Sequence, residues 1–414
     1  MSSIATLTVR EELVYRVLPL DQSFTENYAG IFHFQFWRYG EWIDIVIDDL
    51  LPTHVYEGSR ELIYLHSTTK NEFWTALLEK AFAKLYGCYE NLVWGSMTEA
   101  LGDCTGGLTE ILTNGETDGK KLLTILKRGL EMGSLFGCLF PPPSNGIFGK
   151  AGSNGLVGAH AYSVTSLLKV KTKSGDEQVL LRLRNPWGHT EWKGDWADED
   201  YHWNEAEVLE EVISCHATYK KDGASHSTYK IDGEFCMPFE EFLRLYWRVE
   251  VCNLSAEVRI DGSWSLEENT AGGGPQYPTS YYLNPQFGAR FTVTSDCIEH
   301  DGKCNIIVAV LQKELRIQDN VEAKGSDFPK IGLSIYRAPT NSSGAQDEYF
   351  FSKNKPVATT PECLARRELT VRLRTEPGDY ILVPCTKSPD FEAEFMVRIF
   401  VDGEVDAKRL PFNH

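Results

Sequence analysis

The amino-acid sequence predicts a mixed α+β region followed by an all-β sandwich, in a chain of 414 residues that is long enough for two or three domains. Two observations predict the α+β region: short alternating segments that are typical of strands and, after them, apolar residues at helical spacing. A third observation predicts the sandwich, because short strand-like segments bounded by turns follow one another beyond about residue 252.

Two strands and a helix are predicted within residues 1–90. Apolar and polar side chains alternate over Ile31–Trp37 and Trp42–Asp48, as in half-buried strands, and a short turn sequence joins the two segments. Apolar residues then recur at helical spacing over Phe73–Leu85, and Gly87 is placed to end that helix. We expect the apolar face of this helix to be buried.

A second mixed region is predicted over residues 91–251. It contains a helix at Lys120–Met132 and two strands at Ala161–Lys171 and Gln178–Arg184. A Ser-Gly-Asp turn at residues 174–176 predicts that these strands form a hairpin. The tryptophans that come next are expected to fill a core or to line a cleft: Trp187, Trp192, Trp196 and Trp203.

The third region is predicted to consist of short strands. A turn at Pro377–Gly378 predicts that the last of these strands fold into a meander. The predicted strands are Arg290–Ser295, Asn305–Gln312, Lys330–Arg337, Glu368–Arg374, Asp379–Cys385 and Glu394–Asp402.

The composition of the chain narrows the classes of binding partner that we expect. The net charge is −18, so we expect no binding of nucleic acid through a general basic surface, because phosphate contacts need clustered Lys and Arg. The excess of carboxylates is compatible with calcium, which prefers oxygen ligands, and equally with a solvated acidic surface.

Cysteine usage and hydropathy point to a cytoplasmic protein. None of the ten cysteines forms a C-x-x-C pair, which argues against zinc sites and redox motifs. The N-terminal residues lack the basic and apolar segments of a signal peptide, and no run of about 20 apolar residues predicts a membrane span. Free thiols in a reducing compartment are the simplest interpretation.

Two short segments carry residues suited to catalysis. His160 lies in GAHAYSV at the start of one predicted strand, and Asn185 lies in RNPWG at the end of the next. A lone histidine in such a position is usually structural, but the predicted hairpin brings these two residues to the same open end. A cysteine protease needs an imidazole to take the thiol proton and an amide to orient that imidazole. The flanking Trp187 is placed to shield their hydrogen bond from water.

These segments support a resemblance to a known family. GAHAYSVT followed by LLRLRNPWGHTEWKGDWAD resembles the second protease-core domain of calpains, which are calcium-dependent cysteine endopeptidases. Other segments resemble calpain landmarks in the same order, among them PLDQSFTENYAGIFHFQFW, NEFWTALLEKAFAKLYGCYE, VCNLS and PGDYILVPCT. The resemblance implies that His160 and Asn185 are the catalytic histidine and asparagine. It also implies a papain-like core and a C2-like β-sandwich, with part of core domain 1 at 1–90, core domain 2 at 91–251, the sandwich at 252–402 and a tail at 403–414.

The chain departs from the family pattern in two places. The family's nucleophilic cysteine opens a helix whose next residues resemble the segment Met1–Thr8, so we expect the nucleophile just upstream of Met1 and this chain to be inactive alone. Cys104 follows a Gly-Asp pair but precedes Thr-Gly-Gly, which does not match the family's cysteine. Ala159 stands where the family has glycine, and its methyl group either presses on the histidine backbone or is harmless.

The resemblance also implies calcium ligands, although no segment fits an EF-hand loop. In core domain 2 the expected carboxylates are Glu191, Asp198, Asp232 and Glu234, and Lys230 matches a residue that offers its carbonyl oxygen. An alternative for Asp232–Glu234 is a simple exposed turn.

Glu72 matches a calcium ligand of core domain 1, but Thr69-x-x-Glu72 is also a capping box for the helix that follows. The resemblance implies that the other ligands of that site lie upstream of Met1, so we expect the first calcium site to be incomplete and the second to be nearly complete. The expected partners are protein substrates and, through the C2-like domain, phospholipid. No EF-hand small-subunit partner is expected, because the penta-EF-hand domain of many calpains does not follow in this sequence. The alternative function is a non-catalytic regulator that binds calcium or phospholipid.

Overall fold

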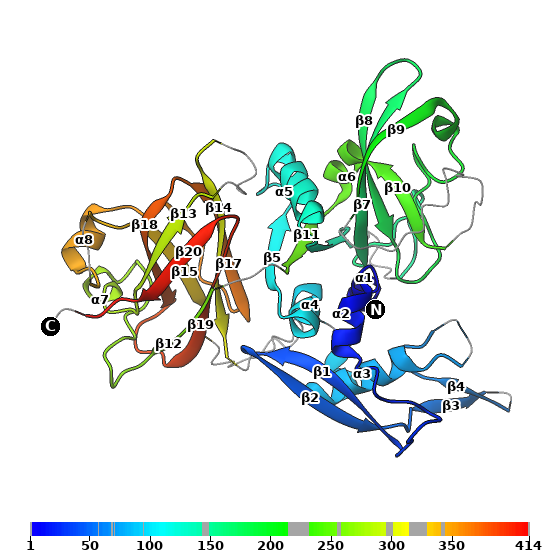
Figure 1. Ribbon diagram of the computed structural model, residues 1–414, viewed down its shortest axis with the longest axis horizontal. Helices are drawn as coiled ribbons and strands as arrows, with labels where there is room; N and C mark the ends of the chain where they lie inside the picture. Colours follow the sequence, from blue (N-terminus) through cyan, green and yellow to red (C-terminus); the bar gives the residue numbers. More distant parts are fainter. Residues whose placement is uncertain are drawn as a thin grey trace. The chain divides into compact units, whose positions relative to one another are not determined.

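The computed structural model describes residues 2–56, 58–67, 69, 71–93, 95–142, 149–213, 232–254, 258–294, 301–313, 329–340 and 344–412. The chain forms two compact units (Figure 1). The N-terminal unit comprises Met1–Arg38 and Trp42–Leu254, and the C-terminal unit comprises Tyr39–Glu41 and Ser255–His414. Each unit has its own hydrophobic core.

The first part of the N-terminal unit packs helices against a strand pair. Phe34 and Phe36 on one face of β1 are fully buried and share a core with Leu77 and Leu101. The predicted strands and helix are confirmed, and Gly87 takes a φ of +101° just after α3. The elements are α1 (Ser2–Leu7), α2 (Glu11–Val17), β1 (Ile31–Arg38), β2 (Glu41–Asp48), β3 (Thr53–Tyr56), β4 (Ser59–Leu62), α3 (Trp74–Leu85), η1 (Tyr89–Leu92) and α4 (Met97–Thr105).

The second part of this unit is built on a seven-stranded sheet with strand order β10-β8-β7-β6-β11-β5, in which β9 also pairs with β7. The predicted helix is confirmed as α5, and the Asp118 carboxylate caps it by accepting from Lys120 N and Lys121 N. The elements are β5 (Leu108–Thr113), α5 (Gly119–Glu131), β6 (Leu135–Leu139), β7 (Ala161–Thr172), β8 (Glu177–Arg184), η2 (Tyr201–Glu205), β9 (Ala206–Ile213), β10 (Glu234–Pro238), α6 (Phe239–Leu245) and β11 (Arg248–Asn253).

The hairpin that matters for the candidate site is confirmed. Strands β7 and β8 pair antiparallel, and the ordered pairing ends at Ser163 opposite Arg184 (Figure 1). The register shifts between Val164 and Ser166, which is a β-bulge. The residues that precede β7 and those that follow β8 therefore meet at the same end of the sheet.

The C-terminal unit is an antiparallel sandwich, as predicted. A four-stranded sheet, β12-β19-β14-β17, and a five-stranded sheet, β16-β15-β18-β13-β20, contribute side chains to one core. Strands β12, β16 and β20 were not predicted, and β13 begins three residues earlier than expected. The elements are β12 (Val258–Trp264), α7 (Pro278–Tyr281), β13 (Phe287–Thr292), β14 (Cys304–Gln312), β15 (Ile331–Arg337), α8 (Glu348–Lys353), β16 (Ala358–Thr359), β17 (Glu368–Thr375), β18 (Gly378–Thr386), β19 (Ala393–Val401) and β20 (Glu404–Arg409).

The predicted meander at the end of the chain is wrong. The turn at Pro377–Gly378 connects β17 to β18, but β17 pairs with β14 in one sheet and β18 pairs with β13 and β15 in the other. Strands β19 and β20 again lie in different sheets. Turn residues show where the chain reverses direction. Each sheet of a sandwich buries apolar side chains on its inner face, so the alternation of apolar and polar residues does not reveal which strands pair.

The helices of both units are short, since α3 has 12 residues and α5 has 13. Within the described ranges, no helix combines the length and the apolar character needed to cross a membrane.

Candidate active site

His160 and Asn185 meet at the open end of the β7–β8 hairpin. The Nε2 atom of His160 lies 2.9 Å from Oδ1 of Asn185. The asparagine side chain is fully buried, and the histidine is half-buried. The two residues lie 25 positions apart in the sequence, and the antiparallel pairing of their strands is what brings them together.

The orientation of the Asn185 amide is set by its own partners. Its Nδ2 group is within hydrogen-bond distance of the carbonyl oxygens of His189 (2.7 Å) and Thr190 (3.1 Å) and of the Thr190 hydroxyl (2.8 Å). Its Oδ1 atom accepts from the backbone N–H of Trp187 at 3.1 Å. Because Oδ1 can only accept, Nε2 of His160 carries the proton, and the Nδ1 lone pair is left for another partner. Among the described residues Nδ1 has no hydrogen-bond partner.

The surroundings of His160 favour a neutral imidazole. Burial lowers the pKa of His160, and the hydrogen bond to Asn185 opposes that shift only in part. The Trp187 ring lies over the imidazole, with the ring centroids 4.2 Å apart, so it covers the hydrogen bond as expected. A neutral ring at neutral pH can accept a proton, which is the property that a general base needs.

The backbone conformation of Ala159 explains why glycine is favoured at the position before the histidine. Its φ is +53°, in the left-handed region where a side chain costs about 1–2 kcal/mol and glycine costs nothing sterically. Its N–H donates to the carbonyl oxygen of Phe140 at 3.0 Å, which holds this conformation in place. The methyl group therefore acts through backbone strain.

None of the described cysteines is placed to act with His160, since none shares a hydrogen bond with it. Burial raises the pKa values of the Cys104 and Cys138 thiols, and it raises that of Cys236 to about 11, which disfavours a thiolate. Cys104, which does not match the family's cysteine in sequence, is buried in the helical core beside Leu101. Cys215 and Cys297 lie outside the described residues.

The helix α1 contacts the strand β7, which begins directly after His160 (Figure 1). The Ser2 hydroxyl donates to the carbonyl oxygen of Ala161 at 2.8 Å, and the buried hydroxyls of Thr6 and Ser163 are 2.7 Å apart. The N-terminal end of this helix is therefore held beside the residue that follows the histidine.

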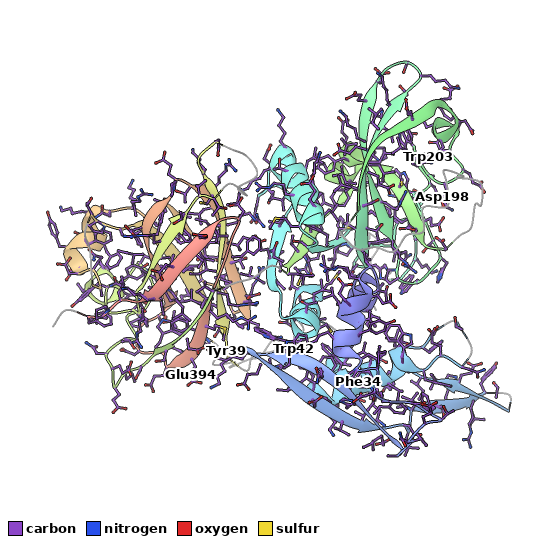
Figure 2. All side chains as sticks on the ribbon, in the orientation of Figure 1. Phe34, Tyr39, Trp42, Asp198, Trp203 and Glu394 are labelled. Carbon is purple, nitrogen blue, oxygen red and sulfur yellow. The ribbon has the colours of Figure 1, made fainter. Side chains whose placement is uncertain are left out.

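The four carboxylates expected to bind calcium in core domain 2 influence one another. The pKa of Asp198 is raised to about 6, first by burial and then by the charges of Glu191, Asp232 and Glu234. Figure 2 labels Asp198 in the segment between β8 and β9. The carboxylates are thus close enough to repel, although no three His, Cys, Asp or Glu side chains in the described part of the chain are grouped as metal ligands. Lys230 lies outside the described residues.

The loop that carries Asp232 is packed against the Asn185 turn. Gly233 is buried with a φ of +88°, and a Cβ atom built on it would lie 2.6 Å from the carbonyl oxygen of Asn185. Asn185 N donates to Gly233 O at 2.7 Å, and Glu191 Oε1 accepts from the N–H groups of Asp232 (2.9 Å) and Gly233 (2.8 Å). Asp232 itself is exposed and its Oδ1 accepts from Glu234 N at 3.0 Å, so an exposed turn stays the alternative to a calcium site.

Glu72 lies apart from this cluster. It accepts hydrogen bonds from the Ser67 hydroxyl and, at 3.1 Å, from Trp74 Nε1. The alternative of a capping box is wrong, because Phe73 is the N-cap of α3 and no side chain caps that helix.

Thr190 was missed by the sequence reasoning. Its hydroxyl and carbonyl groups both hold the Asn185 amide, and its φ of +61° is unusual for a β-branched residue. The only signal in the sequence is its position in the NPWGHT segment, where nothing distinguishes it from an ordinary loop threonine.

Comparisons with known proteins identify the family of the chain. Residues 1–253 match the calpain family of cysteine proteases, and residues 260–400 match domain III of the calpain large subunit. Calpain clp-4 of Caenorhabditis elegans is 42% identical over 99% of this chain and 58% of its own length. Human calpain-8 and the human calpain-2 catalytic subunit are each 39% identical over 98% of this chain.

The chain spans 58% of the length of calpain-8 and 57% of the calpain-2 catalytic subunit. The matches nevertheless cover both of its compact units in the order seen in the relatives. The chain therefore belongs to the calpain family of cysteine proteases.

Proposed function

We propose that this chain carries the general-base half of a calcium-dependent cysteine endopeptidase site, in which His160 is the base and Asn185 orients it. The 2.9 Å contact between Nε2 and Oδ1, with Nδ1 left without a partner among the described residues, is the observation that supports this proposal. It leaves the imidazole in the tautomer that can accept a thiol proton.

The proposed reaction passes one proton through Nδ1 of His160. A cysteine thiol gives its proton to Nδ1, and the thiolate sulfur attacks the carbonyl carbon of the substrate peptide. The imidazolium then returns that proton to the amine nitrogen as the peptide C–N bond breaks, and water afterwards hydrolyses the remaining thioester and regenerates the thiol. Asn185 takes no proton; it holds the ring in place through Nε2, and Trp187 keeps water from that hydrogen bond.

The nucleophile in this proposal is a cysteine that precedes α1. The resemblance places it there, and the contact between Ser2 and Ala161 holds the N-terminal end of α1 beside His160. Because no described cysteine shares a hydrogen bond with the imidazole, we expect a polypeptide of these 414 residues to be inactive alone.

We propose that Glu191, Asp198, Asp232 and Glu234 hold the calcium ion, with a carbonyl oxygen from Lys230 as the resemblance implies. The pKa of Asp198 is raised first by burial and then by the charges of the other three carboxylates, and a divalent cation would relieve this repulsion. The ion would supply positive charge to this loop. Gly233 of this loop packs against the backbone of Asn185, so an ordered loop would help to hold Asn185 and His160 in position.

The test uses casein as substrate with millimolar calcium. We expect no cleavage by the 414-residue polypeptide, and calcium-dependent cleavage when a Gln-Gly-x-Cys-Trp segment is joined ahead of Met1. In the extended chain His160→Ala should abolish turnover, whereas Asn185→Ala should retain part of it, because the amide orients the base and transfers no proton.

Two outcomes would contradict this proposal. Cleavage by the unextended polypeptide that disappears with His160→Ala would show that another nucleophile serves the site. An extended chain that is stabilised by calcium but never cleaves would favour the alternative of a calcium-binding regulator. Phospholipid binding by the C2-like sandwich stays a prediction.

A further inference from the structure

Two cysteine sulfurs in the C-terminal unit lie close to the same glycine, Gly332. Cys385 on β18 lies opposite Gly332 on β15, and Cys363 follows on the other side of β15. A Cβ atom built on Gly332 would lie 2.8 Å from Sγ of Cys363 and 3.3 Å from Sγ of Cys385. Glycine in the interior of a strand often marks a close approach by other groups, and here the two sulfurs occupy the space beside Gly332 that a side chain would need.

The backbone around Cys363 arches out of the regular pairing with β15. Thr360 N donates to Leu333 O at 2.9 Å, and Leu364 and Ile331 exchange two backbone hydrogen bonds of 2.9 Å. Between these anchors, residues 361–363 stand opposite Gly332 alone. Residues 361 and 362 are exposed, whereas Cys363 and Leu364 are partly buried and pack against the hydrophobic cores of the unit, so the arch is held less tightly than a central strand.

The two thiols differ in access and in acidity. Cys363 is half-buried, whereas Cys385 is only 1% exposed and belongs to a small core with Ile381 and Val383. The pKa of Cys363 is lowered, first by a hydrogen bond from the Cys385 thiol and also by the charge of Lys387. The pKa of Cys385 is raised by the same hydrogen bond and by burial. The more accessible thiol therefore has the lowered pKa and lies beside a buried thiol whose pKa is raised, which is the arrangement of an attacking and a resolving cysteine.

We propose that Cys363 and Cys385 form a reversible oxidation site, in which peroxide converts the two thiols to a disulfide across Gly332. The Cys363 thiolate attacks one oxygen of hydrogen peroxide, the O–O bond breaks, and hydroxide leaves as a sulfenic acid forms. The Cys385 sulfur then attacks the sulfenic sulfur, loses its proton and displaces water. Two thiols lose two electrons, and the peroxide is reduced to two molecules of water.

The arch allows Cys363 to approach Cys385 closely enough for a disulfide to form. A disulfide needs the two Cβ atoms about 3.8 Å apart, so one of the two residues has to shift. Cys385 is fully buried in the central strand β18 and is paired with β15, whereas Cys363 lies at the end of the arch at the edge of the sheet. We therefore expect Cys363 to move and β18 to stay in place.

Other described cysteines do not combine an accessible thiol with a neighbouring buried thiol, and they serve as internal controls. Cys88 is exposed and shares no hydrogen bond with another cysteine in the described ranges. Cys104 and Cys252 are both buried, so a peroxide in solution does not reach them in the folded protein. Neither case offers an accessible thiolate with a buried resolving partner.

The experiment treats the reduced 414-residue chain with a small excess of hydrogen peroxide, blocks remaining thiols after unfolding, and maps the tryptic peptides by mass spectrometry. Arg366 and Arg367 lie between the two cysteines, so trypsin separates them unless a disulfide joins the peptides. We expect one linked peptide pair, lighter by two hydrogen atoms. Free thiols should fall by two, from ten to eight per chain, and dithiothreitol should restore them.

Two variants test the assigned roles. In Cys385→Ala we expect no linked pair, slower alkylation of Cys363 at neutral pH, and its oxidation to sulfinic acid. In Cys363→Ser, which nearly keeps the size of this half-buried side chain, the link should be lost while Cys385 stays reduced. The proposal is overturned if the parent chain accumulates sulfinic acid at Cys363 while Cys385 remains free, or if Cys363 reacts no faster than Cys88.

Discussion

Removing the charge of Asp198 is expected to stabilise the metal-free protein. Its carboxylate is half-buried, is repelled by three other carboxylates, and makes no hydrogen bond among the described residues. The variant Asp198→Asn keeps the size of the side chain and removes the charge. Replacing a buried polar residue ordinarily lowers stability. A gain in stability on replacing Asp198 would therefore distinguish charge repulsion from this ordinary effect.

The magnitude follows from the pKa of Asp198, which rises from 3.8 to about 6 on folding. For a fully buried group that shift would correspond to about 3 kcal/mol, and half-exposure to solvent reduces it to roughly 1–1.5 kcal/mol. Because the folded pKa is the higher one, the folded state binds the proton more tightly, and stability falls as pH rises from about 4 to 6. Above pH 6 the full penalty applies.

The assay is a thermal melt of the 414-residue polypeptide in the presence of a chelator, followed through the transition of the N-terminal unit. At pH 7.5 we expect the Tm of Asp198→Asn to exceed that of the parent by about 2–6 °C, and the difference to vanish near pH 4. Asp195→Asn is the matched control, because Asp195 is an exposed carboxylate in the same segment. With calcium the order should reverse, since the parent keeps the ligand.

The reasoning would be refuted by a lower Tm of Asp198→Asn at pH 7.5 in chelator. It would also be refuted by a shift of equal size at pH 4 and pH 7.5, because a charge effect has to follow the titration.

Three further predictions concern the same unit. Thr190→Val removes the hydroxyl that holds the Asn185 amide, so the pKa of His160 should fall in an NMR titration, while Thr190→Ser should behave as the parent; an unchanged pKa would exclude the positioning role. Ala159→Gly should raise stability by about 0.5–1 kcal/mol in denaturant unfolding, because it relieves the left-handed strain; a loss would mean that the strain is negligible. Calcium at a hundredfold excess over its Kd should stabilise the parent by about 2.7 kcal/mol, magnesium should do so poorly, and Asp232→Ala should abolish the effect; melts that do not change with calcium would exclude the site.

Residues close together in the sequence determined much of the fold. The strands β1 and β2 and the helices α3 and α5 follow from side-chain periodicity and from the residues that end them. The β7–β8 hairpin follows in the same way, because a turn sequence between two apolar segments leaves antiparallel pairing as the short connection. For that reason the meeting of His160 and Asn185 could be expected from the amino-acid sequence alone.

Only the tertiary structure decided which distant segments pair and which charges meet. The turn at Pro377–Gly378 could not show that β17 and β18 enter opposite sheets, and the sequence could not show that Gly233 is pressed against Asn185. The pKa of Asp198 and the approach of Cys363 to Cys385 likewise depend on groups that the chain brings together from far apart. Periodicity and turn chemistry act within a few residues, whereas strand partners, desolvation and Coulombic repulsion depend on distances in space that only the folded chain sets.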